Sequence, residues 1–122
     1  MEIGVDIVEI GRIAKSVRNP RFLTRIFAPR EVAYCRSKKN AAQHFAVRFA
    51  AKEAVWKAIA SSAIVRRSFG GRGLAHRDIQ VHNRPNGKPE IQFPKRFTKF
   101  SRRVSISLSH GRDYAVAMAI CR

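Results

Sequence analysis

The alternation of apolar and polar residues predicts strands at both ends of the chain. Residues 3–10 have the pattern of a strand with Ile3, Val5 and Ile7 on one face and Gly4, Asp6 and Val8 on the other. Residues 104–109 alternate an apolar residue with a serine, so we expect one face of this strand to be buried and the other to be small and polar. Residues 114–120 are apolar throughout, which indicates a central strand.

The longest helical pattern lies between these strands, from about residue 41 to residue 61. It is rich in alanine and contains neither glycine nor proline. Phe45, Phe49 and Trp56 fall into one stripe of this helix, and we expect them to hold it against the sheet. Three shorter helices are predicted before it, at residues 12–17, 21–27 and 28–36.

A hairpin is predicted in the second half of the chain. Two short strand patterns, residues 78–82 and 90–93, flank an Asn-Gly pair at position 86, which is a strong hairpin signal. The stretch before them, residues 66–77, is basic and rich in glycine but matches neither the P-loop nor the dinucleotide fingerprint. We interpret it as a mobile connection.

The order of elements predicts an α+β fold in which one long helix packs on a mostly antiparallel sheet, within a single domain spanning residues 1–122. The charge is unusual for such a domain. Lys and Arg number 25 against 8 Asp and Glu, which gives a net charge of +17. Such a field predicts a polyanionic partner: nucleic acid, an anionic membrane, a phosphorylated small molecule or an acidic protein.

The composition also bears on location. Cys35 and Cys121 are too few for a zinc site or a disulfide framework, which suggests a reducing compartment. No segment approaches the roughly 20 apolar residues that are needed to span a membrane. The N-terminus has neither the basic region nor the apolar region of a signal peptide. We therefore expect a cytoplasmic protein with no membrane association.

Charged positions inside the long helix are the first candidates for chemistry. Glu53 and Lys57 are four residues apart and share a face, as do Arg48 and Lys52. Taken alone, the helix favours a surface Glu–Lys pair beside two solvated bases. The alternative is a carboxylate that holds a cation while neighbouring bases hold phosphate.

Asp6 is a reason to consider the cation-binding alternative, because aspartate is depleted in apolar strands. An Asp bonded to backbone or to an arginine explains it as well as a metal ligand does. Together, Asp6 and Glu53 supply two hard oxygen donors, and Mg²⁺ takes one or two carboxylates alongside water and substrate phosphate. Lys57, one turn beyond Glu53, would reach a phosphate bound to the same ion.

Other basic residues could bind further phosphates. Arg48 and the loop pair Lys38 and Lys39 are suited to this role. His110 stands at the end of a strand, a usual place for a functional group, although a surface or capping role is equally expected. The serines of the same strand lack a Gly-x-Ser-x-Gly elbow, so we expect any nucleophile to arrive on a partner.

Several blocks of the chain occur in the order and spacing of bacterial holo-[acyl-carrier-protein] synthases, and the resemblance covers nearly the whole chain. They are Gly4 to Ile10 with Arg12-Ile13, Arg21-Phe22 with Arg25, Arg48 to Ala54 with Lys57-Ala58, Asn86 to Pro89, and Ser107 to His110. The Arg-Phe-Ala-Ala-Lys-Glu-Ala block is the most specific. The chain departs from the family at Ala60, where Gly is usual, and at Gly111, where Thr or Ser is frequent.

The resemblance implies the 4′-phosphopantetheinyl transferase fold and its reaction. Such an enzyme moves the phosphopantetheine arm of coenzyme A to a serine of apo-acyl carrier protein and releases adenosine 3′,5′-bisphosphate, which supports fatty acid biosynthesis. On matched positions, Asp6 and Glu53 would bind Mg²⁺, and Lys57 would bind the pyrophosphate. Glu53 or a metal-bound water would take the proton of the serine, and the water is favoured.

The resemblance also implies binding surfaces and an assembly. The further coenzyme A contacts would be Lys38, Lys39, Arg48 and His110. The surface for the acidic helix of the carrier protein would be Arg12, Arg21, Phe22 and Arg25. Family members of this short type are homotrimers with each active site between two subunits, so the same assembly is expected here.

A small nucleic-acid-binding domain is the rival hypothesis, and the charge alone would favour it. Against this, the phenylalanines lie mostly at helical core spacing and do not form an exposed stacking pattern. Asp6 and Glu53 would also have no role in such a domain. We therefore expect no nucleic-acid partner.

Overall fold

The computed structural model describes residues 1–61 and 74–122, with Arg96 as backbone only. The described elements run in the order β1 (Glu2–Glu9), α1 (Ile10–Ser16), α2 (Pro20–Ile26), α3 (Pro29–Arg36), α4 (Ala41–Ser61), η1 (His76–Asp78), β2 (Gln80–Asn83), β3 (Pro89–Gln92), η2 (Lys95–Arg103), β4 (Val104–His110) and β5 (Tyr114–Cys121). Most of the Gly-rich stretch predicted to be a mobile connection lies outside the described residues. Within the described part, no helix has the length and apolar character to cross a bilayer.

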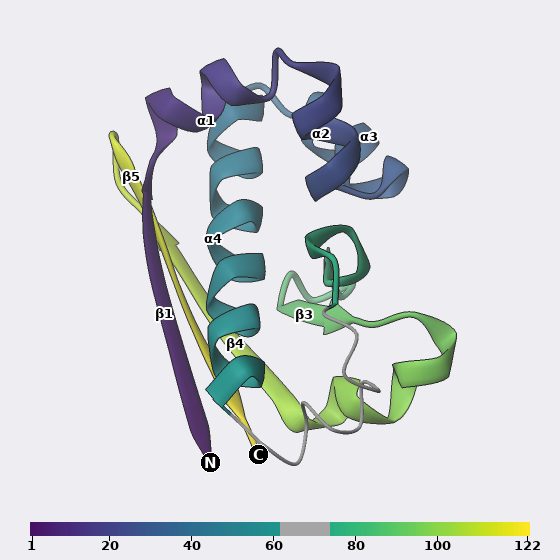
Figure 1. Ribbon diagram of the computed structural model, residues 1–122. Helices are drawn as coiled ribbons and strands as arrows, with labels where there is room; N and C mark the ends of the chain where they lie inside the picture. The colour runs from purple at the N-terminus through teal and green to yellow at the C-terminus, as the bar shows by residue number, and fades with distance from the viewer. Residues whose placement is uncertain (62–73) are drawn as a thin grey trace.

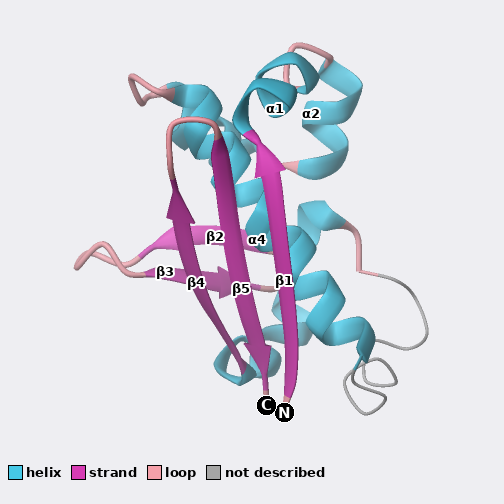
Figure 2. Ribbon diagram, turned by 90° about the vertical axis from the view of Figure 1, so that its left-hand side faces the viewer, coloured by secondary structure: helices cyan, strands magenta, loops and turns pink. Residues whose placement is uncertain are grey.

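Three strands form an antiparallel sheet in the order β1-β5-β4, which Figure 2 shows face on. The predicted central position of the last strand is thus confirmed. β2 and β3 form a separate two-stranded sheet, a division that the sequence pattern does not indicate. The predicted hairpin between them is confirmed, and Gly87 turns the chain at a φ of 87°, a conformation that favours glycine.

α4 lies between the three-stranded sheet and the helices α2 and α3 (Figure 1). Its bounds agree with the prediction, and the α+β class with one long helix on an antiparallel sheet is confirmed. Small residues allow helix and sheet to approach closely. A Cβ atom at Gly4 of β1 would lie 1.9 Å from the carbonyl oxygen of Ala54, and both Ala54 and Ala58 are fully buried.

Phe45 and Phe49 of α4 pack on the side away from the sheet. Phe45 contacts Phe27 edge to face, with ring centroids 5.1 Å apart, and Phe49 packs on Phe22 at 5.9 Å. α2 and the segment that follows it supply these partners, on the opposite side of α4 from β1 (Figure 1). The expectation that the aromatic stripe holds α4 against the sheet was therefore wrong for these two rings, because alanines fill that contact.

A buried ion pair joins α3 to α4. Lys52 Nζ donates to Glu31 Oε1 at 2.6 Å and to the backbone oxygens of Ile79 at 2.6 Å and His76 at 3.1 Å. Burial lowers the pKa of Lys52, and the Glu31 carboxylate opposes this shift. Lys52 is 0% exposed and Arg48 is 4% exposed, so the expectation of two solvated bases on this face was wrong.

The Glu31 carboxylate is also hydrogen-bonded through both of its oxygens. Its Oε1 also accepts from the backbone nitrogen of Ala28 at 3.0 Å, and its Oε2 accepts from that of Val81 at 3.1 Å. Both oxygens of the buried carboxylate are thus satisfied, which offsets the cost of removing it from water.

Gly4→Ala is expected to destabilise the fold by about 2 kcal/mol or more, because the new methyl group meets a backbone oxygen that cannot turn away. Urea unfolding measures the loss. Gly11→Ala is the matched control: a Cβ there meets nothing within 4 Å, and alanine favours helix α1 by roughly 1 kcal/mol over glycine. Equal stability of the two variants would contradict the close approach.

Lys52→Met should lower the free energy of unfolding by about 3–5 kcal/mol, because Glu31 then keeps a buried charge without its partner. Denaturant titration followed by circular dichroism measures this change. Lys15→Met on α1 removes an exposed lysine and should change stability by no more than about 0.5 kcal/mol. A Lys52 variant as stable as the Lys15 variant would contradict the proposed role of the ion pair.

Candidate functional site

Asp6 and Lys57 meet where β1 crosses α4. Lys57 Nζ donates to Asp6 Oδ1 at 3.1 Å and to the backbone oxygen of Val5 at 3.0 Å. The second carboxylate oxygen, Asp6 Oδ2, is buried and has no hydrogen-bond partner among the described residues. A buried carboxylate oxygen without a donor is costly, and a bound cation would satisfy it.

Glu53 lies one turn before Lys57 but bonds elsewhere. Its Oε1 is 2.9 Å from Nε2 of His76, and these two side chains are 27% and 25% exposed. The His76 ring stacks on Phe49 with 12° between the planes. Among the described ion pairs there is no Glu53–Lys57 pair, so the surface pair that the helix alone favours is not formed.

The donors suit a hard cation that is shared with a substrate. Asp6 supplies one buried free oxygen, and the carboxylate of Glu53 is partly exposed. In residues 1–61 and 74–122, no group of three or more His, Cys, Asp or Glu side chains could hold a metal by itself. Mg²⁺ commonly binds through one or two carboxylates, with water and substrate phosphate completing its shell. Asp6 and Glu53 therefore fit magnesium better than a metal that needs a closed protein shell.

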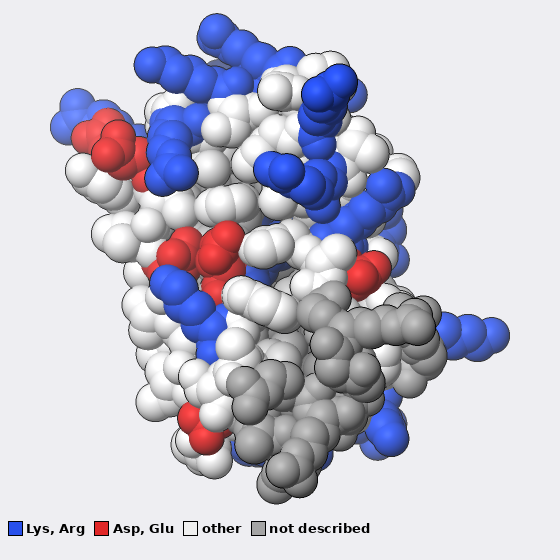
Figure 3. Space-filling view, viewed as in Figure 1, with Lys and Arg blue, Asp and Glu red and all other residues white. Residues whose placement is uncertain are grey.

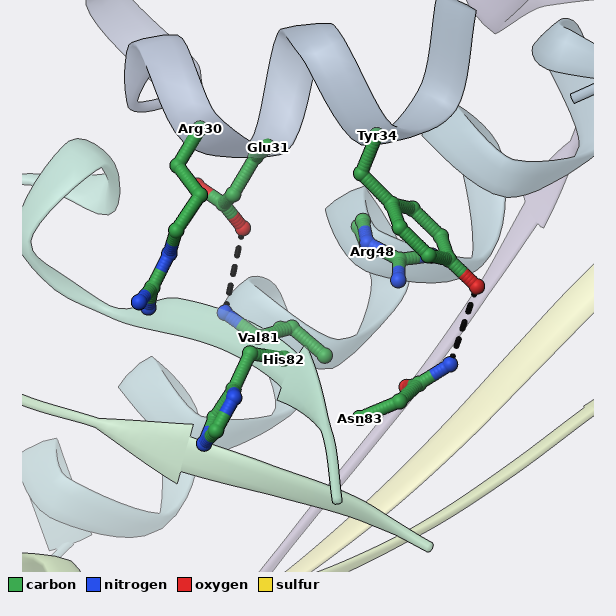
Figure 4. A pocket seen from close by; sticks show the side chains of 7 residues that line it. All are labelled: Arg30, Glu31, Tyr34, Arg48, Val81, His82 and Asn83. Carbon is green, nitrogen blue, oxygen red and sulfur yellow. Dashed lines mark hydrogen bonds between the residues drawn. The ribbon is translucent and has the colours of Figure 1, made fainter. Parts of the chain in front are cut away.

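Arg48 lines a cavity of about 200 Å³ between α3, α4 and β2 (Figure 4). The lining residues are Arg30, Glu31, Tyr34, Arg48, Val81, His82 and Asn83. The guanidinium lies 4.2 Å from the centre of the Tyr34 ring, and its buried Nε has no partner among the described residues. Lys38 Nζ lies 4.9 Å from the same ring, so Tyr34 brings together two of the predicted coenzyme A contacts.

Lys39 and His110 lie near the start of α4. Lys39 lines a groove with Gln43 and Arg112, and Gln43 Nε2 is 2.8 Å from His110 Nδ1. Gln43 precedes Glu53 by ten residues, which places them about 15 Å apart along the helix. Within one chain, these predicted contacts are therefore separated from Asp6, Glu53 and Lys57.

The field around this second group is positive. Burial lowers the pKa of His44, and the charges of Arg48 and Lys38 lower it further. The imidazole ring of His44 also meets Tyr34 edge to face, with centroids 5.8 Å apart. The region favours an anionic ligand over a cationic one.

The predicted carrier-protein surface is largely exposed. Arg12 on α1 and Arg21 and Arg25 on α2 face solvent, and Figure 3 shows basic side chains crowded over these helices. Phe22 is half-buried between Phe27 and Phe49, so much of its ring belongs to the core.

Three residues near these sites were missed by sequence reasoning. Arg77 joins Arg21 and Arg25 along one groove, and its Nη1 donates to the backbone oxygen of Thr24 at 3.3 Å. Arg77 and His76 stand within the stretch interpreted as a connection, where no spacing relates them to α2 or to Glu53. Tyr34 carries no signal of its own in the sequence, since an aromatic residue on a short helix is usually core.

Comparison with known proteins shows the family of the chain. The family model of the 4′-phosphopantetheinyl transferase superfamily matches residues 2–119. The holo-[acyl-carrier-protein] synthase of Koribacter versatilis is 42% identical over 125 residues, covering 96% of this chain and 94% of the relative.

Solved structures give the same result. A holo-(acyl-carrier-protein) synthase from Bacillus anthracis in complex with CoA (3′,5′-ADP) is 31% identical, with a TM-score of 0.76 over 98% of this chain and 94% of that chain. The Helicobacter pylori enzyme in complex with coenzyme A has the same identity and TM-score and covers 98% of this chain and 99% of its own. The chain belongs to the 4′-phosphopantetheinyl transferase superfamily, and holo-[acyl-carrier-protein] synthases are its relatives.

Proposed function

We propose that this chain, as a single domain over residues 1–122, transfers 4′-phosphopantetheine from coenzyme A to a serine of apo-acyl carrier protein. The reaction would release adenosine 3′,5′-bisphosphate and serve fatty acid biosynthesis in the cytoplasm. The observation that carries the proposal is Asp6, whose Oδ1 meets Lys57 while its buried Oδ2 has no hydrogen-bond partner among the described residues. The names of the relatives, and the two relatives solved with coenzyme A or its 3′,5′-ADP part, support the reaction.

Asp6 and Glu53 would hold Mg²⁺, which would supply charge neutralisation on the pyrophosphate oxygens. Lys57 contributes a cation at the same place. Its side chain is 51% exposed, so the ammonium can contact a phosphate while it remains near Asp6. In phosphoryl transfer, the protein mainly positions the groups and offsets charge, and Lys57 would offset the charge on the departing 3′,5′-ADP.

The carrier protein would approach over α1 and α2. Arg12, Arg21 and Arg25 are exposed there, and an acidic helix complements them. Phe22 would add an apolar contact with the part of its ring that stays exposed. α2 also contacts η1, whose His76 bonds Glu53, so this surface adjoins the segment that contacts one proposed metal ligand.

A homotrimer with active sites at the subunit interfaces is part of the proposal. The outer face of the three-stranded sheet carries exposed apolar side chains, among them Ile3, Val5, Ile7 and Met118. Ile7 is 63% exposed and Met118 is 42% exposed. An apolar face of this kind favours burial against another protein surface.

The placement of the coenzyme A residues supports the same assembly. In one chain, Lys39 and His110 lie near the start of α4, away from Glu53, while Lys38 and Arg48 meet on the Tyr34 ring. A second subunit could present its own copies of these residues to the metal ligands of the first. Coenzyme A would then lie between two subunits.

A purified bacterial apo-acyl carrier protein that is incubated with this chain, coenzyme A and Mg²⁺ should gain the mass of one phosphopantetheine. Mass spectrometry of the carrier protein measures this gain. Asp6→Ala and Glu53→Ala should each lower the rate by about 100-fold or more, since a bound metal contributes several kcal/mol to transition-state stabilisation. Glu9→Ala removes an exposed carboxylate from the same strand as Asp6 and should leave the rate unchanged. Equal rates for Asp6→Ala and Glu9→Ala would refute the assignment.

Met118→Lys should dissociate the assembly, because it places a charge on the apolar sheet face that the proposal buries. Size-exclusion chromatography with light scattering should give three times the chain mass for the wild-type protein and a smaller mass for the variant. Thr98→Lys adds the same charge on η2 and should leave the mass unchanged. A wild-type protein with the mass of a monomer would contradict the proposed trimer.

A further inference from the structure

His76 is held in place by three independent contacts. Its backbone oxygen accepts from Lys52 Nζ at 3.1 Å, which ties η1 to the buried ion pair. Its ring stacks on Phe49, with centroids 6.3 Å apart and 12° between the planes. Its Nε2 then faces Glu53 Oε1 at 2.9 Å. These contacts hold the imidazole next to Glu53.

The direction of this hydrogen bond follows from chemistry. A carboxylate oxygen only accepts, so Nε2 of His76 carries the hydrogen, whether the ring is neutral or charged. The hydrogen bond uses one lone pair of Glu53 Oε1 and thereby sets the direction in which Oε2 points. Without the contact, the partly exposed carboxylate of Glu53 could turn towards Lys57, one helical turn away.

We propose that His76 is a positioning residue, which orients the Glu53 carboxylate so that its second oxygen is presented to Mg²⁺. The inference rests on the proposed role of Glu53 as a metal ligand. Groups that hydrogen-bond a metal ligand fix its orientation, and their loss typically weakens metal binding by about 10–100-fold. The role needs a donor at the place of Nε2 and a ring or chain that packs on Phe49.

Two substitutions separate the donor from the ring. His76→Phe keeps a flat ring on Phe49 but removes the donor, whereas His76→Gln keeps an amide N–H near the place of Nε2. Isothermal titration of Mg²⁺ into the protein saturated with coenzyme A, without carrier protein, measures cation affinity apart from turnover. His76→Phe should bind Mg²⁺ about 10-fold more weakly or worse, and His76→Gln should recover most of the affinity.

Turnover adds a second readout. The activity of His76→Phe should return towards the wild-type level at high Mg²⁺, because a merely positional defect is overcome by mass action. His76→Leu is a second donor-free variant in case the phenylalanine ring disturbs the packing on Phe49, and it should behave as His76→Phe does. Thermal unfolding of each variant monitors the fold.

The outcomes distinguish a failure of the His76 proposal from a failure of the proposed function on which it rests. If Glu53→Ala loses Mg²⁺ binding while His76→Phe and His76→Leu bind it as the wild-type protein does, the inference fails and the proposed function stands. Equal losses in His76→Phe and His76→Gln also overturn it, since the donor would then not matter. If Asp6→Ala and Glu53→Ala both keep wild-type Mg²⁺ affinity, the proposed metal site itself is wrong.

Discussion

The pair of Lys52 and Glu31 is the contact on which the rest of the structure depends. Burying two charges costs several kcal/mol for each ion, and only full pairing and hydrogen bonding offset this cost. Here the ammonium has three acceptors and the carboxylate has two backbone donors besides Lys52. These partners come from α3, α4, η1 and the start of β2, so one interaction fixes four segments that are distant in the sequence. His76 is one of them, which links this core contact to Glu53.

Neighbouring residues of α4 therefore have different roles. Lys52 and Glu53 are adjacent in the sequence, and a step of one residue turns a helix by about 100°. Lys52 points into the core between α3 and η1, while Glu53 is partly exposed and faces the imidazole of His76. The Arg-Phe-Ala-Ala-Lys-Glu-Ala block therefore contains residues for packing and residues proposed for chemistry. Its alanines permit the close approach of β1, Lys52 forms the buried ion pair, and Glu53 is the proposed metal ligand.

Sequence reasoning succeeded where a pattern is local. The uninterrupted helix formers defined α4, the apolar run defined β5, and the Asn-Gly pair defined the hairpin. It failed where the outcome depends on tertiary contacts. The pattern places Lys52 in solvent, and only the contact with Glu31, 21 residues earlier, accounts for its burial. The aromatic stripe gives no sign that alanines occupy the sheet contact. For the site, the sequence paired Asp6 with Glu53 as two hard oxygen donors, and the family resemblance strengthened the pairing, but nothing in it placed His76 on Glu53.

β1 connects the proposed chemistry to the proposed assembly. Its side chains alternate between faces, so Asp6 points towards α4 while Val5 and Ile7 lie on the exposed apolar face. The backbone oxygen of Val5 also accepts from Lys57, which holds the ammonium beside Asp6. A subunit that covered the outer face would restrain the strand that carries one proposed metal ligand and positions the proposed phosphate-binding lysine. Assembly would therefore order the site itself, besides bringing in the coenzyme A residues of a second chain.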